Sequence, residues 1–128
     1  MMDDENLTWQ DRWEAAATAQ RADFEAMSPE DLVNYVRNGN IGGYYNVWYV
    51  IAAKCTLEQA GWLLMDVVER AKDDLVRYHA LAALGQMLGL PEGDERIHAS
   101  LVREYPVATE SLSQVKKLLE ERIGPMKA

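Results

Sequence analysis

The residues of this chain that could bind a metal or attack a substrate are few and far apart. There are two histidines, His79 and His98, and one cysteine, Cys55, and their spacing matches no set of metal ligands. Cys55 comes just before a predicted helix start, where the pKa of a thiol falls, but a lone cysteine is more often a small buried residue. We therefore predict a buried Cys55, a hydrogen-bonded or groove-lining His79, and no metal or other cofactor.

Carboxylates are plentiful, but they fall at predicted helix starts or on solvent-facing positions. Acid–base catalysis needs two groups whose environments push their pKa values apart, whereas capping and solubility explain these acids. The segment Ile41-Gly42-Gly43 is not a phosphate-binding loop, because it follows no strand and has no lysine after it. We predict that the chain is not an enzyme.

Aromatic residues are the more informative group. Four tryptophans and six tyrosines are many for 128 residues, and several lie together between Tyr44 and Tyr49. Tyrosine and tryptophan are enriched at binding hot spots because they offer a large rigid surface with a polar end. We expect Trp48 and Trp62 to belong to the core, since large apolar side chains at helical spacing usually face inward. The tyrosines predicted to line a partly exposed groove are Tyr44, Tyr45 and Tyr78.

The elements that position these side chains are predicted to be helices throughout. Apolar residues recur at three- and four-residue intervals, no stretch alternates convincingly over strand length, and glycine and proline fall between the segments. The segment 44–54 is apolar and β-branched enough to allow a strand, but its Ala-Ala-Lys end and its helical neighbours favour a buried helix. The predicted fold class is all-α, with six or seven helices and no sheet.

The predicted helices form one domain over 1–128, made of a first helix and three helical hairpins. Serine or threonine caps mark three helix starts, at Thr8, Ser28 and Thr56. The first helix spans 8–26, and one stripe of it carries Trp9, Trp13, Ala17 and Phe24. The hairpins span 28–54, 56–89 and 91–123, the last with helices over 92–104 and 109–122.

One segment of the second hairpin matches a repeat pattern at every fixed position. Residues 73–85 read Asp-Asp-Leu-Val-Arg-Tyr-His-Ala-Leu-Ala-Ala-Leu-Gly. This segment resembles the second helix of a HEAT-type repeat of the PBS-lyase kind, whose pattern is Asp-x-x-Val-Arg-x-x-Ala-x-x-Ala-Leu-Gly. The matching residues are Asp73, Val76, Arg77, Ala80, Ala83, Leu84 and Gly85. The resemblance implies a stacked helical array and a structural role for Arg77, since the equivalent arginine commonly bridges to an acid of an adjacent repeat.

The resemblance is specific only in the middle hairpin. The first hairpin lacks the Val-Arg pair and the Leu-Gly end, and the third lacks the motif altogether. Terminal repeats of such arrays are often atypical because they must cap the core. Both a short HEAT-like array of antiparallel hairpins and a non-repeating helical bundle therefore remain open.

The charge and composition of the chain narrow the classes of partner and the cellular location that we expect. The net charge is −8 and the pI is near 4.7, so we expect no nucleic-acid binding and favour a basic partner. No apolar run approaches the roughly 20 residues of a membrane span, and the acidic N-terminal residues lack a signal-peptide core. With a single cysteine, these features predict a cytoplasmic protein.

The leading hypothesis is a non-enzymatic protein–protein interaction module. Its sharper form is a bacterial immunity protein that neutralises a basic toxin, on the analogy of small acidic helical proteins with that role. The predicted binding residues are Tyr44, Tyr45, Asp74, Arg77, Tyr78 and His79. Two alternatives remain open. One is an accessory subunit of a bilin- or lysine-modifying enzyme, beside which HEAT-like repeats occur. The other is a structural homo-oligomer that buries the aromatic segment.

Overall fold

The computed structural model describes residues 8–40, 42, 44–91, 94 and 109–126. The helices in this part of the chain are α1 (Trp9–Glu25), α2 (Pro29–Arg37), α3 (Asn46–Lys54), α4 (Leu57–Arg70), α5 (Asp74–Met87) and α7 (Thr109–Ile123). No strand occurs among the described residues, so the all-α prediction is confirmed and segment 44–54 contains a helix. The helix predicted over 92–104, with His98, lies outside the described residues.

Side-chain caps begin the helices at the predicted positions. The Thr8 hydroxyl accepts a hydrogen bond from the backbone N–H of Asp11 at 3.1 Å, and the Thr56 hydroxyl accepts one from Gln59 at 3.2 Å. In both cases the side chain three residues later, Asp11 or Gln59, accepts a hydrogen bond from the backbone N–H of the capping threonine, which completes a capping box. The Asp73 carboxylate accepts the first free N–H groups of α5 in the same way.

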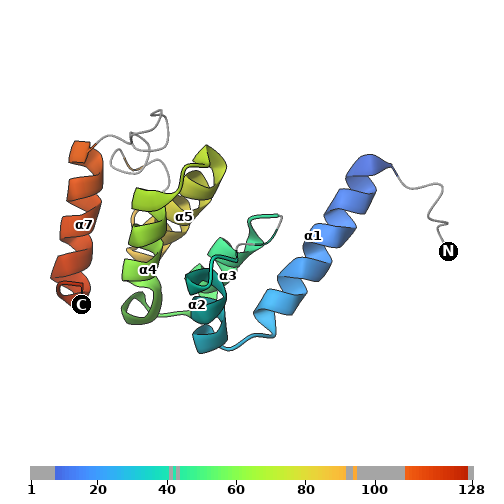
Figure 1. Cartoon of the computed structure of the whole chain (residues 1–128), viewed down its shortest axis with the longest axis horizontal. Helices are drawn as coiled ribbons and strands as arrows, with labels where there is room; N and C mark the ends of the chain where they lie inside the picture. The colour runs from blue at the N-terminus through green and yellow to red at the C-terminus, as the bar shows by residue number, and fades with distance from the viewer. Residues whose placement is uncertain (1–7, 41, 43, 92–93, 95–108, 127–128) are drawn as a thin grey trace.

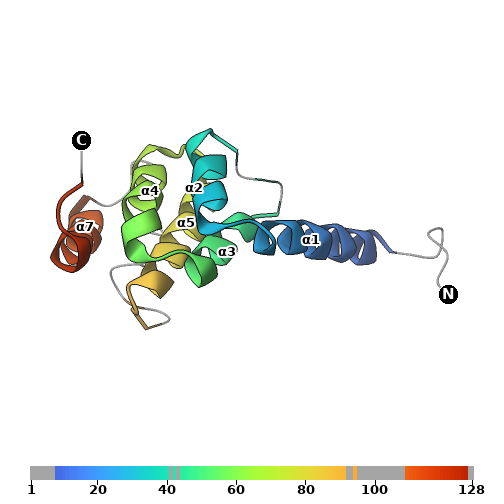
Figure 2. The same cartoon turned by 90° about the horizontal axis from the view of Figure 1, so that it is seen from below.

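The helices are arranged as two hairpins side by side, with one further helix at each end. The hairpins are α2 with α3 and α4 with α5, and α2 contacts α4 while α3 contacts α5. Helix α1 packs on α3, and α7 packs on α4, so α1 and α7 lie at opposite ends of the array (Figures 1 and 2). The HEAT-like character of this array stays a prediction.

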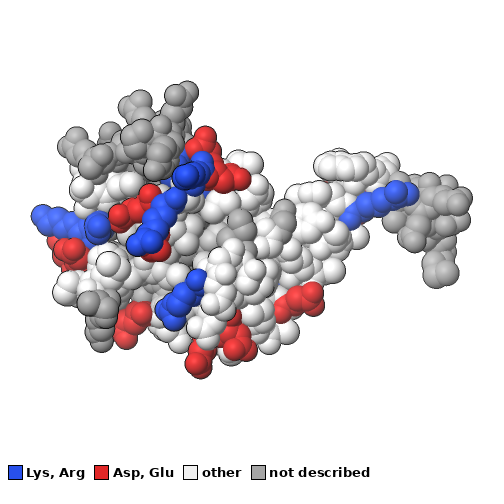
Figure 3. Space-filling view, viewed as in Figure 1, with Lys and Arg blue, Asp and Glu red and all other residues white. Residues whose placement is uncertain are grey.

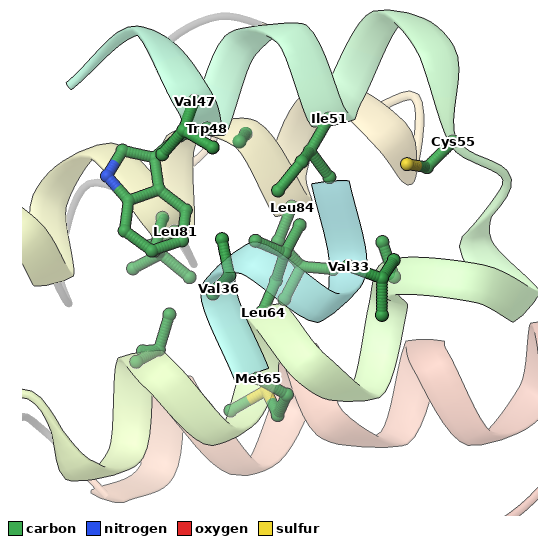
Figure 4. Packing of buried hydrophobic residues seen from close by; sticks show 14 of the residues in the cluster. Val33, Val36, Val47, Trp48, Ile51, Cys55, Leu64, Met65, Leu81 and Leu84 are labelled. Carbon is green, nitrogen blue, oxygen red and sulfur yellow. The ribbon is translucent and has the colours of Figure 1, made fainter. Parts of the chain in front are cut away.

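The core lies inside the two hairpins. Figure 4 shows side chains from α2, α3, α4 and α5 converging on one apolar cluster, among them Trp48, Leu64 and Leu81, all three at 0% exposure. The core position predicted for Trp48 is confirmed. Its indole N–H has no hydrogen-bond partner among the described residues, so apolar packing alone holds the ring in place.

Helix α1 is covered along only part of its length. Phe24 is buried near its C-terminal end, but Trp13 is 44% exposed and Trp9 is 79% exposed. Lys54 fastens the C-terminal end of α1, since its ammonium donates to the carbonyls of Glu25 and Met27, both at 2.6 Å. The first turns of α1, which carry Trp9 and Trp13 of the predicted stripe, therefore extend beyond the body of the molecule (Figures 1 and 2).

Candidate functional site

A strip of aromatic rings runs from α1 across the start of α3 to α5, where three tyrosine rings contact His79. The His79 ring stacks on Tyr45 with centroids 4.6 Å apart and planes 20° apart. It meets Tyr49 and Tyr78 edge-on, at 5.6 and 5.1 Å. These distances fall within the range of favourable aromatic pairs. We call this surface the aromatic strip, and its members are Trp13, Tyr44, Tyr45, Tyr49, Tyr78 and His79.

The backbone at Tyr45 sets how the strip is laid out. Tyr45 has a φ of 59°, a left-handed conformation that costs a non-glycine residue on the order of 1–3 kcal/mol. The turn sends two successive rings to different helices, because Tyr44 packs edge-on against Trp13 at 5.4 Å while Tyr45 stacks on His79. The same turn explains why α3 begins at Asn46 and not at Tyr44 as predicted.

A hydrogen bond joins α3 to α5 beneath the rings. The Tyr49 hydroxyl and Nδ1 of His79 are 2.6 Å apart. Burial raises the pKa of Tyr49, with a smaller contribution from Tyr78, and burial lowers the pKa of His79. Both shifts favour the neutral forms, whereas a tyrosine nucleophile would need a lowered pKa. The geometry therefore makes this pair a connection between two helices, formed by a neutral hydroxyl and a neutral imidazole.

Asp74 and Arg77, one turn from the rings, differ sharply in exposure. Arg77 is only 3% exposed and donates to the carbonyl of Ala71 at 3.3 Å and to the carboxylate of Asp74 at 2.5 Å. The Asp74 side chain is 70% exposed. Arg77 thus braces the turn between α4 and α5. Arg77 is buried, so the binding role predicted for it stays a prediction, and Asp74, the acid that it contacts among the described residues, lies on its own helix and not in an adjacent repeat as the resemblance implied.

The structure brings most of the predicted binding residues together. The rings of Tyr45 and Tyr78 both contact His79, and Tyr44, which packs on Trp13 instead, is next to Tyr45 in the chain. Tyr49 was missing from the predicted set, although it lies one helical turn after Tyr45 and this spacing could have identified it. The exposure of the tryptophans on α1 had no signal in the sequence, since an apolar stripe does not reveal where its cover ends.

A second surface is a groove of about 470 Å³ along the outer side of α4. Its lining residues come from α2, α4 and the end of α7, and they are Arg37, Glu58, Gln59, Trp62, Leu63, Asp66, Ile123, Pro125 and Met126. Trp62 is half-buried here, so its predicted core position holds only in part. Its indole N–H donates to the carbonyl of Gly124 at 3.2 Å, which ties the end of α7 to α4. Trp62 therefore has a structural task in this groove.

Two further kinds of reactive group can be assessed among the described residues: the thiol of Cys55 and groups of metal-ligating side chains. Cys55 is 8% exposed, as predicted, and its thiol donates to the carbonyl of Pro29 at 3.8 Å. Burial raises the pKa of this thiol despite the opposing effect of Lys54, which is the reverse of what an active nucleophile needs. In the part of the chain that the structure describes, no three histidine, cysteine or acidic side chains are grouped as a metal site would require.

Comparison with known proteins gives this chain no relative. No protein-family model, no curated protein and no solved structure matches it. None of the helices formed by the described residues has both the length and the apolar composition of a membrane span.

Proposed function

We propose that this chain is a protein-binding module that contacts its partner through the aromatic strip, and that it is not an enzyme. One observation carries the proposal: the distribution of exposed large apolar side chains. Across the described residues these are Trp9, Trp13, Leu75, Tyr78 and Met126. All but Met126 belong to the strip or lie one helical turn or less from a member of it. Gathered apolar exposure of this kind marks interaction surfaces, and tyrosine and tryptophan dominate their energetics.

The chemistry of the rings supports binding over catalysis. The polar atoms at the centre of the strip are those of Tyr49 and His79, and they bond to each other in neutral form. Their mutual bond holds α3 and α5 in register, so the ring of Tyr78 is presented on a fixed scaffold. A rigid aromatic anchor loses little conformational entropy when a partner covers it.

We further propose that the partner is a basic protein and that the chain acts as its dedicated inhibitor, as an immunity protein acts on a toxin. The support is the net charge of −8, which accelerates encounter with a basic surface and disfavours nucleic acid. Within α1 four acids stand against two arginines, Arg12 and Arg21, and Arg21 is paired with Glu25 at 2.9 Å. Charge would guide association, while the rings supply the affinity.

The test is capture of partners from the native host lysate by the tagged full-length chain, at about 50 mM and about 500 mM salt. We expect one stoichiometric basic protein, retained less at high salt and lost with Tyr78→Ala. Trp62→Ala is the matched control, because it removes an aromatic ring from the groove and leaves the strip intact. Thermal unfolding of each variant shows that a lost partner does not reflect a lost fold.

Retention that is equal for Tyr78→Ala and the native chain would refute the strip as the contact surface. Retention of an acidic protein, or indifference to salt, would refute the basic partner while leaving the strip in place. Turnover of a captured small molecule would refute the non-enzymatic proposal.

A homo-oligomer is the second candidate, and the 79% exposure of Trp9 favours it. Two copies could cover each other's tryptophans in a symmetric interface. Light scattering over a range of concentrations separates the candidates. A monomer supports the partner-binding proposal, whereas a dimer that Trp9→Ala dissociates would replace it.

A further inference from the structure

The surface around the aromatic strip has two sides and a floor. Trp9 and Trp13 of α1 form one side, and Leu75 and Tyr78 of α5 form the other. Between them lie Tyr44 and Tyr45 at the start of α3, which contacts both α1 and α5. Figure 3 shows the surface hollowed between α1 and the body of the molecule, and the side chains drawn there, apart from the grey atoms, carry no charge. We call this surface the aromatic trough.

The backbone chemistry of the trough selects the shape of its occupant. A segment that docks as an added β-strand must pair its N–H and C=O groups with the edge of a sheet. The described residues contain no strand and therefore offer no such edge. A helix satisfies these groups internally and needs only side-chain contacts from its host.

The spacing of the side chains agrees with a helical occupant. Trp9 and Trp13 are four residues apart on α1, and Leu75 and Tyr78 are three residues apart on α5, so each side carries two apolar or aromatic groups one helical turn apart. Helices dock by placing ridges of this spacing into the grooves of a neighbour. The trough thus has the contact pattern that a further helix of this array would meet.

The charges around the trough indicate which polar side chains the occupant should carry. Exposed acids on α1 flank the tryptophans at Asp11 and Glu14, and the exposed carboxylate of Asp74 lies one turn before Tyr78. Arg12 and Lys72 are also close by, so the local excess of acid is small and the net charge of −8 supplies the longer-range attraction. A partner helix with lysine or arginine beside its apolar face complements this field.

We infer that the aromatic trough binds a basic amphipathic helix of a partner protein, whose apolar face is seated between the tryptophans of α1 and Tyr78 of α5. This inference rests on the proposed function and narrows it from a basic protein to a basic helix. The occupant is a helix of a partner protein, and the test distinguishes it from a second copy of this chain.

The test uses three synthetic peptides of about 18 residues and the full-length chain. The first places leucine and lysine at helical spacing. The second has the same composition in a strict alternation that suits a strand. The third replaces each lysine of the first with glutamate. Titration calorimetry measures affinity, and NMR chemical shifts of the backbone amides locate the contact.

We expect only the helical lysine peptide to bind, with shifts at Trp13, Tyr45 and Tyr78. Trp13→Ala and Tyr78→Ala should each weaken its affinity by about tenfold or more, while Trp62→Ala should leave it within about twofold. Equal binding of the alternating peptide, equal binding of the glutamate peptide, or no effect of either trough variant would overturn the inference. So would a dimer of the free chain that Tyr78→Ala dissociates, because the occupant would then be a second copy.

Failure of the inference and failure of the proposed function give different results. If the lysate partner depends on Tyr78 but no helical peptide binds, the strip is a contact surface for some other shape and only the inference falls. If neither the lysate partner nor the peptide depends on Tyr78, the proposed function falls with it.

Discussion

The aromatic strip and the groove along α4 both expose aromatic rings, but they use these rings differently. In the groove, the N–H of Trp62 bonds to the carbonyl of Gly124, 62 residues further along the chain, and this bond holds α7 in place. In the strip, Tyr78 lies 43% exposed at the edge of the cluster and meets His79 of its own helix. A ring that connects two elements stabilises the fold, whereas a ring at the edge of a supported cluster is free to meet a partner. Substitutions should separate these two roles.

The largest effect on stability is expected beneath the strip, at Arg77. Arg77→Met removes the donors that reach the carbonyl of Ala71 and the carboxylate of Asp74, and it leaves a partly buried acceptor unpaired. Hydrogen bonds of charged groups contribute about 1.5–3 kcal/mol each, so we expect a loss of about 2–3 kcal/mol in urea denaturation. Lys72→Met, at an exposed neighbouring position, should change stability by about 0.5 kcal/mol or less. Unchanged stability with loss of the partner would show that Arg77 is a contact residue.

The next effect is expected where α4 meets α7. A Cβ atom added at Gly61 would lie 2.7 Å from Cδ1 of Leu119 and 3.3 Å from Cδ1 of Ile123. Gly61→Val should therefore overpack this contact and cost about 1–3 kcal/mol, with faster hydrogen exchange in α7. Valine forms helix more readily than glycine, so helix propensity does not explain this loss. Ala53→Val, at an exposed position of α3, shows what a helical valine costs where nothing is overpacked. Slow exchange in α7 of the Gly61 variant would mean that the contact adapts without strain.

A smaller effect is expected from the groove tryptophan. Trp62→Phe keeps most of the ring and removes the N–H that reaches Gly124, so stability should fall by about 1 kcal/mol in thermal unfolding. Tyr78→Phe is the matched change in the strip and should leave stability within about 0.5 kcal/mol. The comparison between the two surfaces fails if the Tyr78 variant is the less stable of the pair.

The smallest effect is a pH dependence at the centre of the strip. Burial lowers the pKa of His79 from 6.5, so the unfolded chain binds more protons than the folded one once the pH falls towards this value. The contribution of His79 is complete above about pH 6.5 and is lost progressively below it. Between about pH 7.5 and about pH 5.5, His79→Gln should therefore lose less stability than the native chain. His98 is present in both proteins, so an equal loss would assign the pH dependence elsewhere.

The sequence predicted the elements well because their signals are local. A cap such as Thr8 or Thr56 bonds to a backbone group three residues away, so the same few letters that suggest the helix start also create it. The boundary at Tyr44 was wrong because Tyr45 is left-handed, so α3 begins only at Asn46, and neither a capping residue nor a glycine stands at position 45 to mark this turn. Local patterns do not contain that information.

The candidate site was predicted in composition but not in connectivity. The sequence indicated Tyr45, Tyr78 and His79, and the structure places Tyr45 on His79, 34 positions further along the chain, with Tyr78 beside His79. The sequence could not separate the buried Arg77 from the exposed Asp74, because both lie in the first turn of one helix and differ only in what covers them. The half-buried position of Trp62 could not be predicted either, because its bond to Gly124 depends on where α7 ends.

The positions of the four tryptophans make this protein its own optical reporter. Trp48, at 0% exposure and without a hydrogen-bond partner in the described part of the chain, should emit at short wavelength and resist collisional quenchers until the fold is lost. Trp9 and Trp13 should emit at long wavelength and be quenched readily, and a ligand that covers them should shift their emission to the blue. A variant that retains only Trp13 would thus signal occupancy of the trough, and one that retains only Trp48 would signal unfolding, without any added label.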